Sequence, residues 1–310
     1  MKRIQYYRYG GPEEMHLETY ELPAPRKDEI VVRVKAASIN PVDWKVRQGA
    51  LKFMVRGQFP RAMGSDFSGV VESVGAGVTR FCAGDDVLGT TPPNTSGAFA
   101  EKVITKEKRA VKKPTSLSYE DAAILPIVGV TAWLALVSKG HLRAGQRVFV
   151  NGAYGGVGQA AVHIAKALGA LVAGRVGPGA LSDTRAIGAD PVLDYLKDIP
   201  DDLNKSFDIV FDCNGSLTPR QGDALIKRGG VVIDINPTFS KLMRSLFSRH
   251  RKFVFASLGA ENLQKVVDLA ASGKLPISIG RKATLEKAIA LISDLETGRR
   301  PKGKAVIVMQ

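Results

Sequence analysis

The sequence Asn-Gly-Ala-Tyr-Gly-Gly-Val-Gly at residues 151–158 decides the fold of this chain. An apolar run precedes it, and residues 159–168 follow with apolar side chains at helical spacing. Ala153, Gly155 and Gly158 take the three positions of a G-x-G-x-x-G fingerprint, with alanine at the first position. A strand, a glycine turn and a helix in this order predict a dinucleotide-binding turn, because a tight turn and an approaching pyrophosphate leave little room for side chains.

The helix that is expected to follow this turn would present free backbone N–H groups and the positive end of its dipole to an anion. We therefore predict cofactor contacts at Ala153, Gly155, Gly156 and Val157. The alternative is a glycine-rich turn that binds no ligand.

The two halves of the chain differ in their pattern. The first 110 residues contain short apolar strands separated by glycine and proline turns, which favours a small barrel or sandwich. From about residue 118, strand-like and helix-like segments alternate, which predicts right-handed βαβ units and a parallel sheet. Residues 285–295 indicate a helix and residues 303–308 a last strand, which we expect to pair back onto the first domain.

The composition limits the class of protein. A length of 310 residues allows two domains, and 45% hydrophobic with 24% charged residues is typical of a globular chain. Cys82 and Cys213 are too few for a disulfide framework or a structural zinc site. No apolar run has the roughly 20 residues that a membrane helix needs. The polar N-terminus argues against a signal peptide, so we expect a cytoplasmic protein.

The formal net charge of +14 favours attraction to polyanions. Basic residues are dense only at residues 241–252, and no nucleic-acid motif accompanies them, so we expect no nucleic-acid partner. A solvated surface is the preferred interpretation of this stretch, and a peripheral contact with an anionic membrane is the second.

The preferred form of the cofactor depends on the end of the second strand. NAD enzymes usually place an acidic residue there, about 20 residues after the first glycine, to bind the ribose 2′-hydroxyl. This chain has Gly174, Arg175, Val176 and Gly177 at that place. A guanidinium suits a 2′-phosphate, so Arg175 favours NADPH over NADH. The alternative is that Arg175 is merely solvated.

Several further stretches resemble the medium-chain dehydrogenase/reductase superfamily, and more closely its zinc-independent quinone oxidoreductase branch. They are residues 40–45 (Asn-Pro-Val-Asp-Trp-Lys), 64–71, 83–87, 129–133, 188–190 and the closing pair 303–304. The form of residues 40–45 is similar to plastid-envelope quinone oxidoreductase homologues and to alkenal/enone oxidoreductases. The resemblance covers nearly the whole chain.

The resemblance implies an α/β fold with a GroES-like, β-rich domain at residues 1–118 and 276–310. It implies a Rossmann domain with a doubly wound parallel sheet at residues 119–275. The cleft between them would hold the nicotinamide and the substrate, and the relatives imply a homodimer. The implied activity is NADPH-dependent reduction of a conjugated acceptor, which is a quinone or the C=C bond of an α,β-unsaturated carbonyl.

The resemblance also shows where this chain departs from zinc-dependent relatives. They carry Cys at the place of Asn40 and Gly-His-Glu at the place of residues 64–66. Catalytic zinc needs about three ligands, which Asp66 alone cannot supply, so we expect no metal. Conjugate reduction, unlike alcohol oxidation of the zinc type, does not need a metal ion as a Lewis acid, because a hydrogen-bond donor near the carbonyl oxygen is enough to stabilise an enolate.

The resemblance assigns candidate catalytic residues to the loop at residues 40–45. Asn40 and Lys45 correspond to the family's active-site wall. Lys45 would contact the cofactor or steady the developing oxyanion, and the alternative is a surface lysine beside a structural loop. Asp43 and Asp66 are expected to have a structural role in hydrogen bonding within the loop.

The remaining cofactor candidates lie at element ends. Thr131 resembles a cofactor-contacting threonine, with a helix cap as the alternative. Tyr195 matches a tyrosine that lies near the 2′-phosphate in relatives, although Ala180 falls near the place of the family's usual lysine. Ligands of doubly wound sheets lie beyond the carboxyl ends of the strands, which predicts further wall residues there. These further candidates are Cys213, Asn214 and Asn236, to which the closing Lys304 is added from the resemblance.

A second hypothesis belongs to a different class. Some zinc-free relatives keep the cofactor site but have slight turnover and act as binding proteins. In that case residues 241–252, which interleave basic and apolar side chains, would dock on anionic lipid or on a partner.

Overall fold

The computed structural model describes residues 1–53, 55, 57–92, 97–236, 248, 250–254, 259–299 and 301–309. The chain forms two compact units. Unit 1 consists of Met1–Ile127, Leu258–Ala271 and Ser278–Gln310, and unit 2 consists of Val128–Ser257 and Ser272–Ile277. The residues of α2 (Tyr119–Ala123) and α8 (Ala260–Ala271), which the sequence placed in the Rossmann domain, thus group with unit 1. The reason is their packing, since α2 lies on the main sheet of unit 1 and α8 lies beside its strand at Ala110–Lys112.

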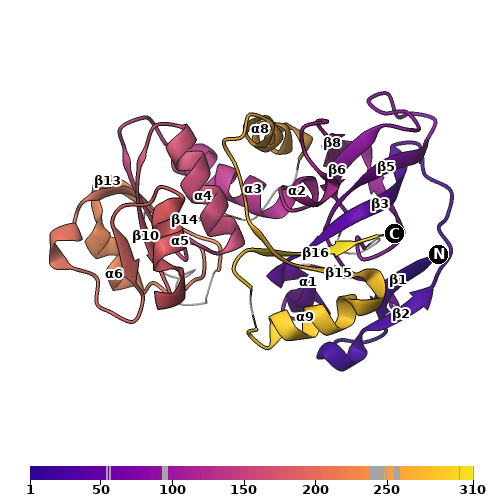
Figure 1. The fold of residues 1–310 in the computed structure, drawn as a ribbon, viewed down its shortest axis with the longest axis horizontal. Coiled ribbons are helices and arrows are strands. Elements are labelled where there is room, and N and C mark those ends of the chain that lie inside the picture. The colour runs from indigo at the N-terminus through magenta and orange to yellow at the C-terminus, as the bar shows by residue number, and fades with distance from the viewer. Residues whose placement is uncertain are drawn as a thin grey trace. The chain divides into compact units, whose positions relative to one another are not determined.

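Unit 1 is built mainly from antiparallel strands (Figure 1). Its strands are β1 (Lys2–Tyr6), β2 (His16–Thr19), β3 (Glu29–Ile39), β4 (Arg61–Ala62), β5 (Asp66–Val74), β6 (Asp86–Thr90), β7 (Lys102–Lys106), β8 (Ala110–Lys112), β15 (Ile279–Thr284) and β16 (Lys304–Val308). Its helical segments include η1 (Pro12–Glu14), α1 (Pro41–Arg47), η2 (Glu107–Arg109), η6 (Leu285–Lys287) and α9 (Ala288–Glu296). Helix α3 (Pro126–Trp133) contains the boundary between the two units.

The main sheet of unit 1 has the order β15-β16-β3-β5-β6-β8, and β7 also pairs with β3. A small sheet has the order β2-β1-β4. The expected return of the last strand is confirmed, because β16 pairs antiparallel with β3 and Ala305 lies opposite Ile39. Apolar side chains from both ends of the chain share one core, which includes Ile4, Val32, Phe67, Phe99, Leu291 and Ile307.

Unit 2 is a six-stranded parallel sheet with helices packed beside it (Figure 1). Its strands are β9 (Arg147–Asn151), β10 (Leu171–Val176), β11 (Val192–Asp194), β12 (Phe207–Asp212), β13 (Ile226–Asp234) and β14 (Arg251–Phe253). Its helical segments include η3 (Leu134–Lys139), α4 (Gly156–Ala167), η4 (Pro178–Ala180), α5 (Leu181–Ala186), η5 (Asp201–Leu203) and α6 (Pro219–Leu225).

The sheet order β11-β10-β9-β12-β13-β14 confirms the doubly wound topology. The chain runs outward from β9 to one edge and then returns to build the other half from β12. The reversal therefore lies beside the glycine turn that follows β9, which is where such sheets bind ligands. Strands β9 and β12 contribute the buried rings of Phe149 and Phe207 to the core of unit 2. The centroids of these rings lie 5.2 Å apart in an edge-to-face contact.

No helix in the described ranges is long and apolar enough to cross a membrane. Residues 241–247 and 249 make up most of the basic stretch, for which a solvated surface is the preferred interpretation and a membrane contact the second, and they lie outside the described residues.

Candidate functional site

The glycine turn joins β9 to α4 and takes its shape from Gly152 and Gly158. Gly152 adopts a φ of +83°, in the left-handed region that favours glycine. Its N–H donates to the Arg175 carbonyl at 2.8 Å, which fixes the turn to the end of β10. A Cβ on Gly158 would lie 2.0 Å from the Gly152 carbonyl oxygen, so only glycine fits where the helix passes the turn. The close approach of the α4 backbone to the backbone of the turn thus explains the last glycine of the fingerprint.

The turn presents the start of α4 to solvent without a side-chain cap. Gly155 is exposed, Gly156 and Val157 are half-buried, and no side chain bonds to the N–H groups of the first turn at the N-cap. An α-helix of 12 residues with uncapped N–H groups is a suitable site for an anion. Ala153 differs from the other predicted residues, because it is fully buried against Gly174 and shapes the turn instead of facing a ligand.

Asn151 connects the ends of β9 and β12. It is 1% exposed, and its Nδ2 donates to Asp212 Oδ1 and to Asn214 Oδ1, both at 2.8 Å. Asp212 also accepts from the Gly215 N–H at 2.9 Å and the Leu217 N–H at 3.0 Å. The loop after β12, which includes the predicted residue Asn214, is therefore held rigidly next to the glycine turn. Sequence reasoning missed Asn151 and Asp212, whose only signal was their position as the last residues of two strands.

The loops after β12 and β13 lie against each other. The Asn236 N–H donates to Asp234 Oδ1 at 2.7 Å, and Asn236 Nδ2 donates to the Asn214 carbonyl at 3.4 Å. Cys213 is half-buried, and its N–H donates to the Asn151 carbonyl at 2.9 Å. Burial, with the charges of Asp212 and Asp234, raises the pKa of Cys213 well above its usual value. The thiol therefore stays protonated, which disfavours a role as a nucleophile, and it lies at the carboxyl end of β12.

Arg175 lies near the end of β10, and Tyr195 directly follows the neighbouring strand β11, but the two residues have different surroundings. Arg175 is 8% exposed, and its NH2 group donates to the Tyr195 carbonyl at 3.0 Å and to the Lys197 carbonyl at 3.4 Å. The Tyr195 ring is 53% exposed and covers Gly177, where a Cβ would lie 2.9 Å from Cε1. The structure therefore uses the Arg175 guanidinium to hold the loop after β11, and it leaves Tyr195 at the surface.

Lys45 and Thr131 lie on helices. Lys45 is half-buried on α1, whose start carries a capping box formed by Asn40 and Asp43. Thr131 is 6% exposed and lies inside α3, away from the helix end where a cap would stand.

A buried polar network surrounds Asn40 in unit 1. Asn40 Nδ2 donates to Asp66 Oδ2 at 2.9 Å and to the Ser38 carbonyl at 3.3 Å, while its Oδ1 accepts from Lys304 Nζ at 2.6 Å. Lys304 also donates to the Ile39 carbonyl at 2.8 Å. Both the nitrogen and the oxygen of the Asn40 side-chain amide are thus hydrogen-bonded within unit 1, and Lys304 is one of these buried partners. These contacts give Asn40 the role of a positioning residue.

Two carboxyl groups in this network have unusual proton affinity. Burial raises the pKa of Asp43 to about 6, although hydrogen bonds from Ser65 and the Asn40 N–H oppose the shift. Burial likewise raises the pKa of Asp66 to about 8 against the charge of Lys304. Asp66 Oδ1 is buried without a hydrogen-bond partner, which disfavours the charged form. The same burial lowers the pKa of Lys304 to about 8.

The network does not fit a zinc ion. Asn40 and Ser65 take the two places where zinc-dependent relatives carry Cys and His, and Ser65 Oγ donates to Asp43 Oδ1 at 2.7 Å. The Lys304 ammonium next to Asn40 Oδ1 would repel a divalent cation at that place. Across the described ranges, no three His, Cys, Asp or Glu side chains gather where they could hold a metal ion.

Comparison with known proteins gives the same picture for the whole chain. Residues 26–115 match the family model of the alcohol dehydrogenase GroES-like domain, and residues 187–307 match that of the zinc-binding dehydrogenases. The chain is 32% identical to the chloroplast envelope quinone oxidoreductase homolog of Arabidopsis thaliana, over 93% of this chain and 92% of that protein. It is 33% identical to the 2-methylene-furan-3-one reductase of Solanum lycopersicum, over 99% of this chain and 79% of that protein.

Solved structures extend the likeness to the fold. The quinone oxidoreductase of Coxiella burnetii superposes with a TM-score of 0.89 at 29% identity, covering 100% of this chain and 99% of that one. The Escherichia coli quinone oxidoreductase, solved in complex with NADPH, gives a TM-score of 0.85 at 25% identity, covering 99% of this chain and 100% of that one.

Proposed function

Because the chain belongs to the quinone oxidoreductase branch of the medium-chain dehydrogenase/reductase superfamily, we propose that this oxidoreductase uses NADPH to reduce a conjugated acceptor. The acceptor is a quinone or the C=C bond of an α,β-unsaturated carbonyl. Relatives named for each of these two reactions match the chain over nearly its whole length. The observation that carries the proposal is the turn of residues 152–158, whose close backbone packing and uncapped helix start fit a dinucleotide pyrophosphate.

The residues of unit 2 bind and orient the cofactor in this proposal. The N–H groups at Gly156 and Val157 hold the pyrophosphate, and the loop fixed by Asn151 and Asp212 carries Asn214 to the same edge. When bound, the nicotinamide would supply the hydride to the β-carbon of the acceptor, and water would supply the proton that completes the reduction.

In this proposal, residues of unit 1 stabilise the negative charge that develops on the acceptor during hydride transfer. Lys45 donates to the carbonyl oxygen on which negative charge develops as the β-carbon receives the hydride. Asn40 does not touch the acceptor; it holds the start of α1, and with it Lys45, through its bonds to Asp66 and Lys304. The Lys304 ammonium next to Asn40 supports a reaction that uses no metal ion.

The preference for NADPH rests on the end of β10. No acidic side chain stands at residues 174–177 to bind a ribose 2′-hydroxyl. The exposed Tyr195 ring lies beside Gly177 at this strand end, so we propose Tyr195 as the group next to the 2′-phosphate. Arg175 then acts indirectly, because its guanidinium holds the backbone of residues 195 and 197.

A spectrophotometric panel tests the function. The protein is mixed with NADPH and, in turn, a quinone, an enal and an enone, and the loss of the nicotinamide absorbance is followed. We expect turnover of at least one acceptor, unchanged after dialysis against a chelator, and at least tenfold weaker use of NADH. Tight NADPH binding without turnover of any acceptor would contradict the proposal and favour a cofactor-binding protein. Equal affinity for NADH would contradict the cofactor preference alone.

Four further properties stay predictions. We propose a homodimer by analogy with the family, which light scattering tests as a mass twice that of one chain. The anionic-membrane contact falls on residues 241–252, most of which lie outside the described residues. The cytoplasmic location and the absence of a nucleic-acid partner rest on the sequence.

A further inference from the structure

A solvent-facing hollow of about 850 Å³ lies in unit 2 where β12, β13 and β14 begin. Its charged lining consists of four permanent cations, one carboxyl group and one imidazole, and these are Lys205, Lys227, Arg228, Lys252, Asp223 and His250. A surface concavity with so strong an excess of positive charge concentrates small anions.

The hollow is separate from the dinucleotide turn. Strands β9, β12, β13 and β14 are all parallel, and the turn follows the carboxyl end of β9. Lys205 precedes β12 and His250 precedes β14, so the hollow lies at the amino ends of these strands. The two features therefore lie at opposite edges of the same sheet.

Two of the cations, Lys227 and Arg228, lie where the hydrogen-bond ladder between β12 and β13 is interrupted. Phe207 pairs with Ile226 and Ile209 pairs with Val231, so residues 227–230 bulge out of the ladder between β12 and β13. Arg228 is exposed on this bulge. The bulge ends in two glycines, and a Cβ on Gly229 would meet no heavy atom within 4 Å, which leaves this part of the rim open.

Other cations of the hollow are held in place by neighbours. Lys252 Nζ donates to the Lys139 carbonyl at 2.7 Å, and Lys227 Nζ lies 2.5 Å from Asp208 Oδ1. Lys205 adopts a φ of +51°, which is uncommon for a residue with a side chain. Its N–H donates to the Ala224 carbonyl at 2.7 Å, which fixes it against the end of α6. Strained residues of this kind gather at binding sites, and here the strain falls on a lysine of the rim.

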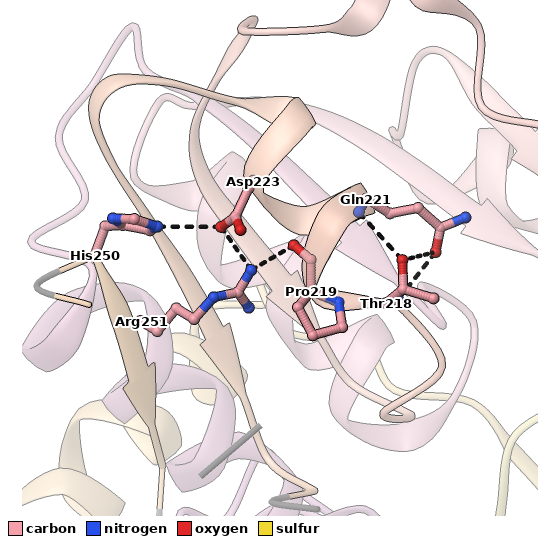
Figure 2. Close-up of polar contacts among 6 residues, drawn as sticks. All are labelled: Thr218, Pro219, Gln221, Asp223, His250 and Arg251. Carbon is pink, nitrogen blue, oxygen red and sulfur yellow. Dashed lines mark hydrogen bonds and ion pairs between the residues drawn. The ribbon is translucent and has the colours of Figure 1, made fainter. Parts of the chain in front are cut away.

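Asp223 does little to offset this charge, because it is already paired. Figure 2 shows its carboxylate between two basic side chains, with Arg251 NH2 2.5 Å and His250 Nε2 3.1 Å from Oδ1. Arg251 also donates to the Pro219 carbonyl at the start of α6. Among the described lining residues Asp223 is the one carboxylate, and Arg251 and His250 pair with it from the side of β14. Asp208 pairs in turn with Lys227, so the excess positive charge of the hollow rests on Lys205, Arg228 and Lys252.

We propose that this hollow binds a small soluble molecule that carries two or more phosphate charges. Lysine and arginine contacts to phosphate oxygens are the charge-assisted hydrogen bonds that such a site offers. A single charge on an exposed site is largely screened at physiological salt, where the Debye length is about 8 Å, so the ligand must be multivalent. This inference does not depend on the proposed reaction, since the hollow and the turn lie at opposite edges of the sheet.

The probe for the test is inorganic pyrophosphate, titrated by calorimetry at physiological salt into protein already saturated with NADPH. The variant carries Lys227→Gln, Arg228→Gln and Lys252→Gln, and the matched control carries Lys108→Gln, Lys265→Gln and Lys274→Gln. Both variants lose three positive charges, and the control positions are exposed and outside the hollow. We expect saturable binding that weakens about tenfold or more in the variant and less than about twofold in the control. The single change Arg228→Glu on the exposed bulge gives the same answer if the triple variant misfolds.

Three results would overturn the proposal. The first is the absence of saturable pyrophosphate binding by the unaltered protein. The second is equal weakening in the variant and its control, which would mean that net charge alone attracts the anion. The third is binding to vesicles that contain phosphatidylglycerol without binding to pyrophosphate, which would assign the surface to a membrane.

Discussion

Gly155 and Gly158 lie in the same turn but meet different surroundings. A Cβ on Gly158 would overlap the Gly152 carbonyl at 2.0 Å, whereas a Cβ on Gly155 would lie 3.4 Å from the same oxygen. Gly155 also has an ordinary φ of −70°, which alanine adopts without strain. Gly158 is thus required by packing, while Gly155 leaves space at the start of α4 that a ligand can use.

This difference predicts separate effects for two alanine substitutions. Gly158→Ala should lower the free energy of unfolding by about 1–3 kcal/mol, because the turn must move to admit the methyl group. Gly155→Ala should leave stability within about 0.5 kcal/mol but weaken NADPH binding, because the methyl group occupies the approach of the pyrophosphate. Denaturant unfolding and NADPH fluorescence measure the two effects. Equal loss of stability in both variants would refute the assignment.

Lys45 gives a second prediction at this scale. If it steadies the developing oxyanion, Lys45→Ala should reduce kcat/KM by about 100-fold, with most of the loss in kcat. Lys45→Arg should recover part of the rate because it keeps a donor and a charge, and Lys52→Ala on the exposed part of the following loop serves as the control. An unchanged kcat/KM in Lys45→Ala would remove the lysine from the reaction.

Local structure around the candidate site was predictable from the sequence where the constraint is local. The strand, glycine turn and helix around residues 152–158 met that condition because they are consecutive, while the binding role of the turn stays a prediction. Asn151 and Asp212 were missed because 61 residues separate the two partners. The role of Arg175 was predicted from its charge and its place after the second strand, and the fold instead directs its NH2 group to carbonyls about 20 residues later.

At the scale of elements, the network around Asn40 joins the end of β3, the start of α1, the start of β5 and the start of β16. Asp66 accepts from Asn40 and from the Ile127 N–H at 3.2 Å, so it also connects β5 to α3. Five elements, from β3 near the start of the sequence to β16 at its end, are thus joined by a few buried polar groups. The protonation state of these groups is therefore important for stability.

Asp66 predicts a pH dependence. The folded chain keeps the Asp66 proton up to about pH 8, whereas the unfolded chain releases it near 3.8. The folded state therefore binds more protons between these values, and the free energy of unfolding falls as the pH rises through the window, by at most about 1.4 kcal/mol per pH unit. Lys304, whose pKa is lowered to about 8, acts in the opposite sense above that pH.

The variant Asp66→Asn isolates this contribution, because asparagine can accept the same hydrogen bonds and does not titrate. Urea unfolding at intervals from pH 5 to pH 8 should show the unaltered protein losing stability relative to the variant as the pH rises. Parallel curves for the two proteins would mean that Asp66 is charged throughout this range.

Elements with a regular apolar pattern were predicted well, and short ones were not. The strand-like segments expected after residue 118 include β12 and β13, whose apolar runs are typical of central parallel strands. Strand β14 was missed: Arg251-Lys252-Phe253 has one apolar residue, and pairing with β13 at the sheet edge makes it a strand. The residues of α2 and α8, expected from the sequence to belong with the parallel sheet, group with unit 1, because packing, which the sequence does not show, decides this grouping.

At the scale of the whole molecule, the glycine turn and its supporting loop belong to unit 2 alone. NADPH at 100 times its Kd should raise the free energy of unfolding of the bound state by about 2.7 kcal/mol. Hydrogen exchange should show this protection at residues 152–158 and 213–215, with little change in β1, β2 and β15. Protection spread evenly over the chain would contradict a turn-centred site.

Strand β16 completes the sheet of unit 1 and delivers Lys304 to Asn40, across a separation of 264 residues. During synthesis, the ribosome must therefore finish all of unit 2 before unit 1 can close its sheet. The nascent chain holds residues 36–39 of β3 without their β16 neighbour while the later parallel sheet already has every described strand. This edge of β3 is therefore exposed to pairing with other chains until the last strand has been synthesised.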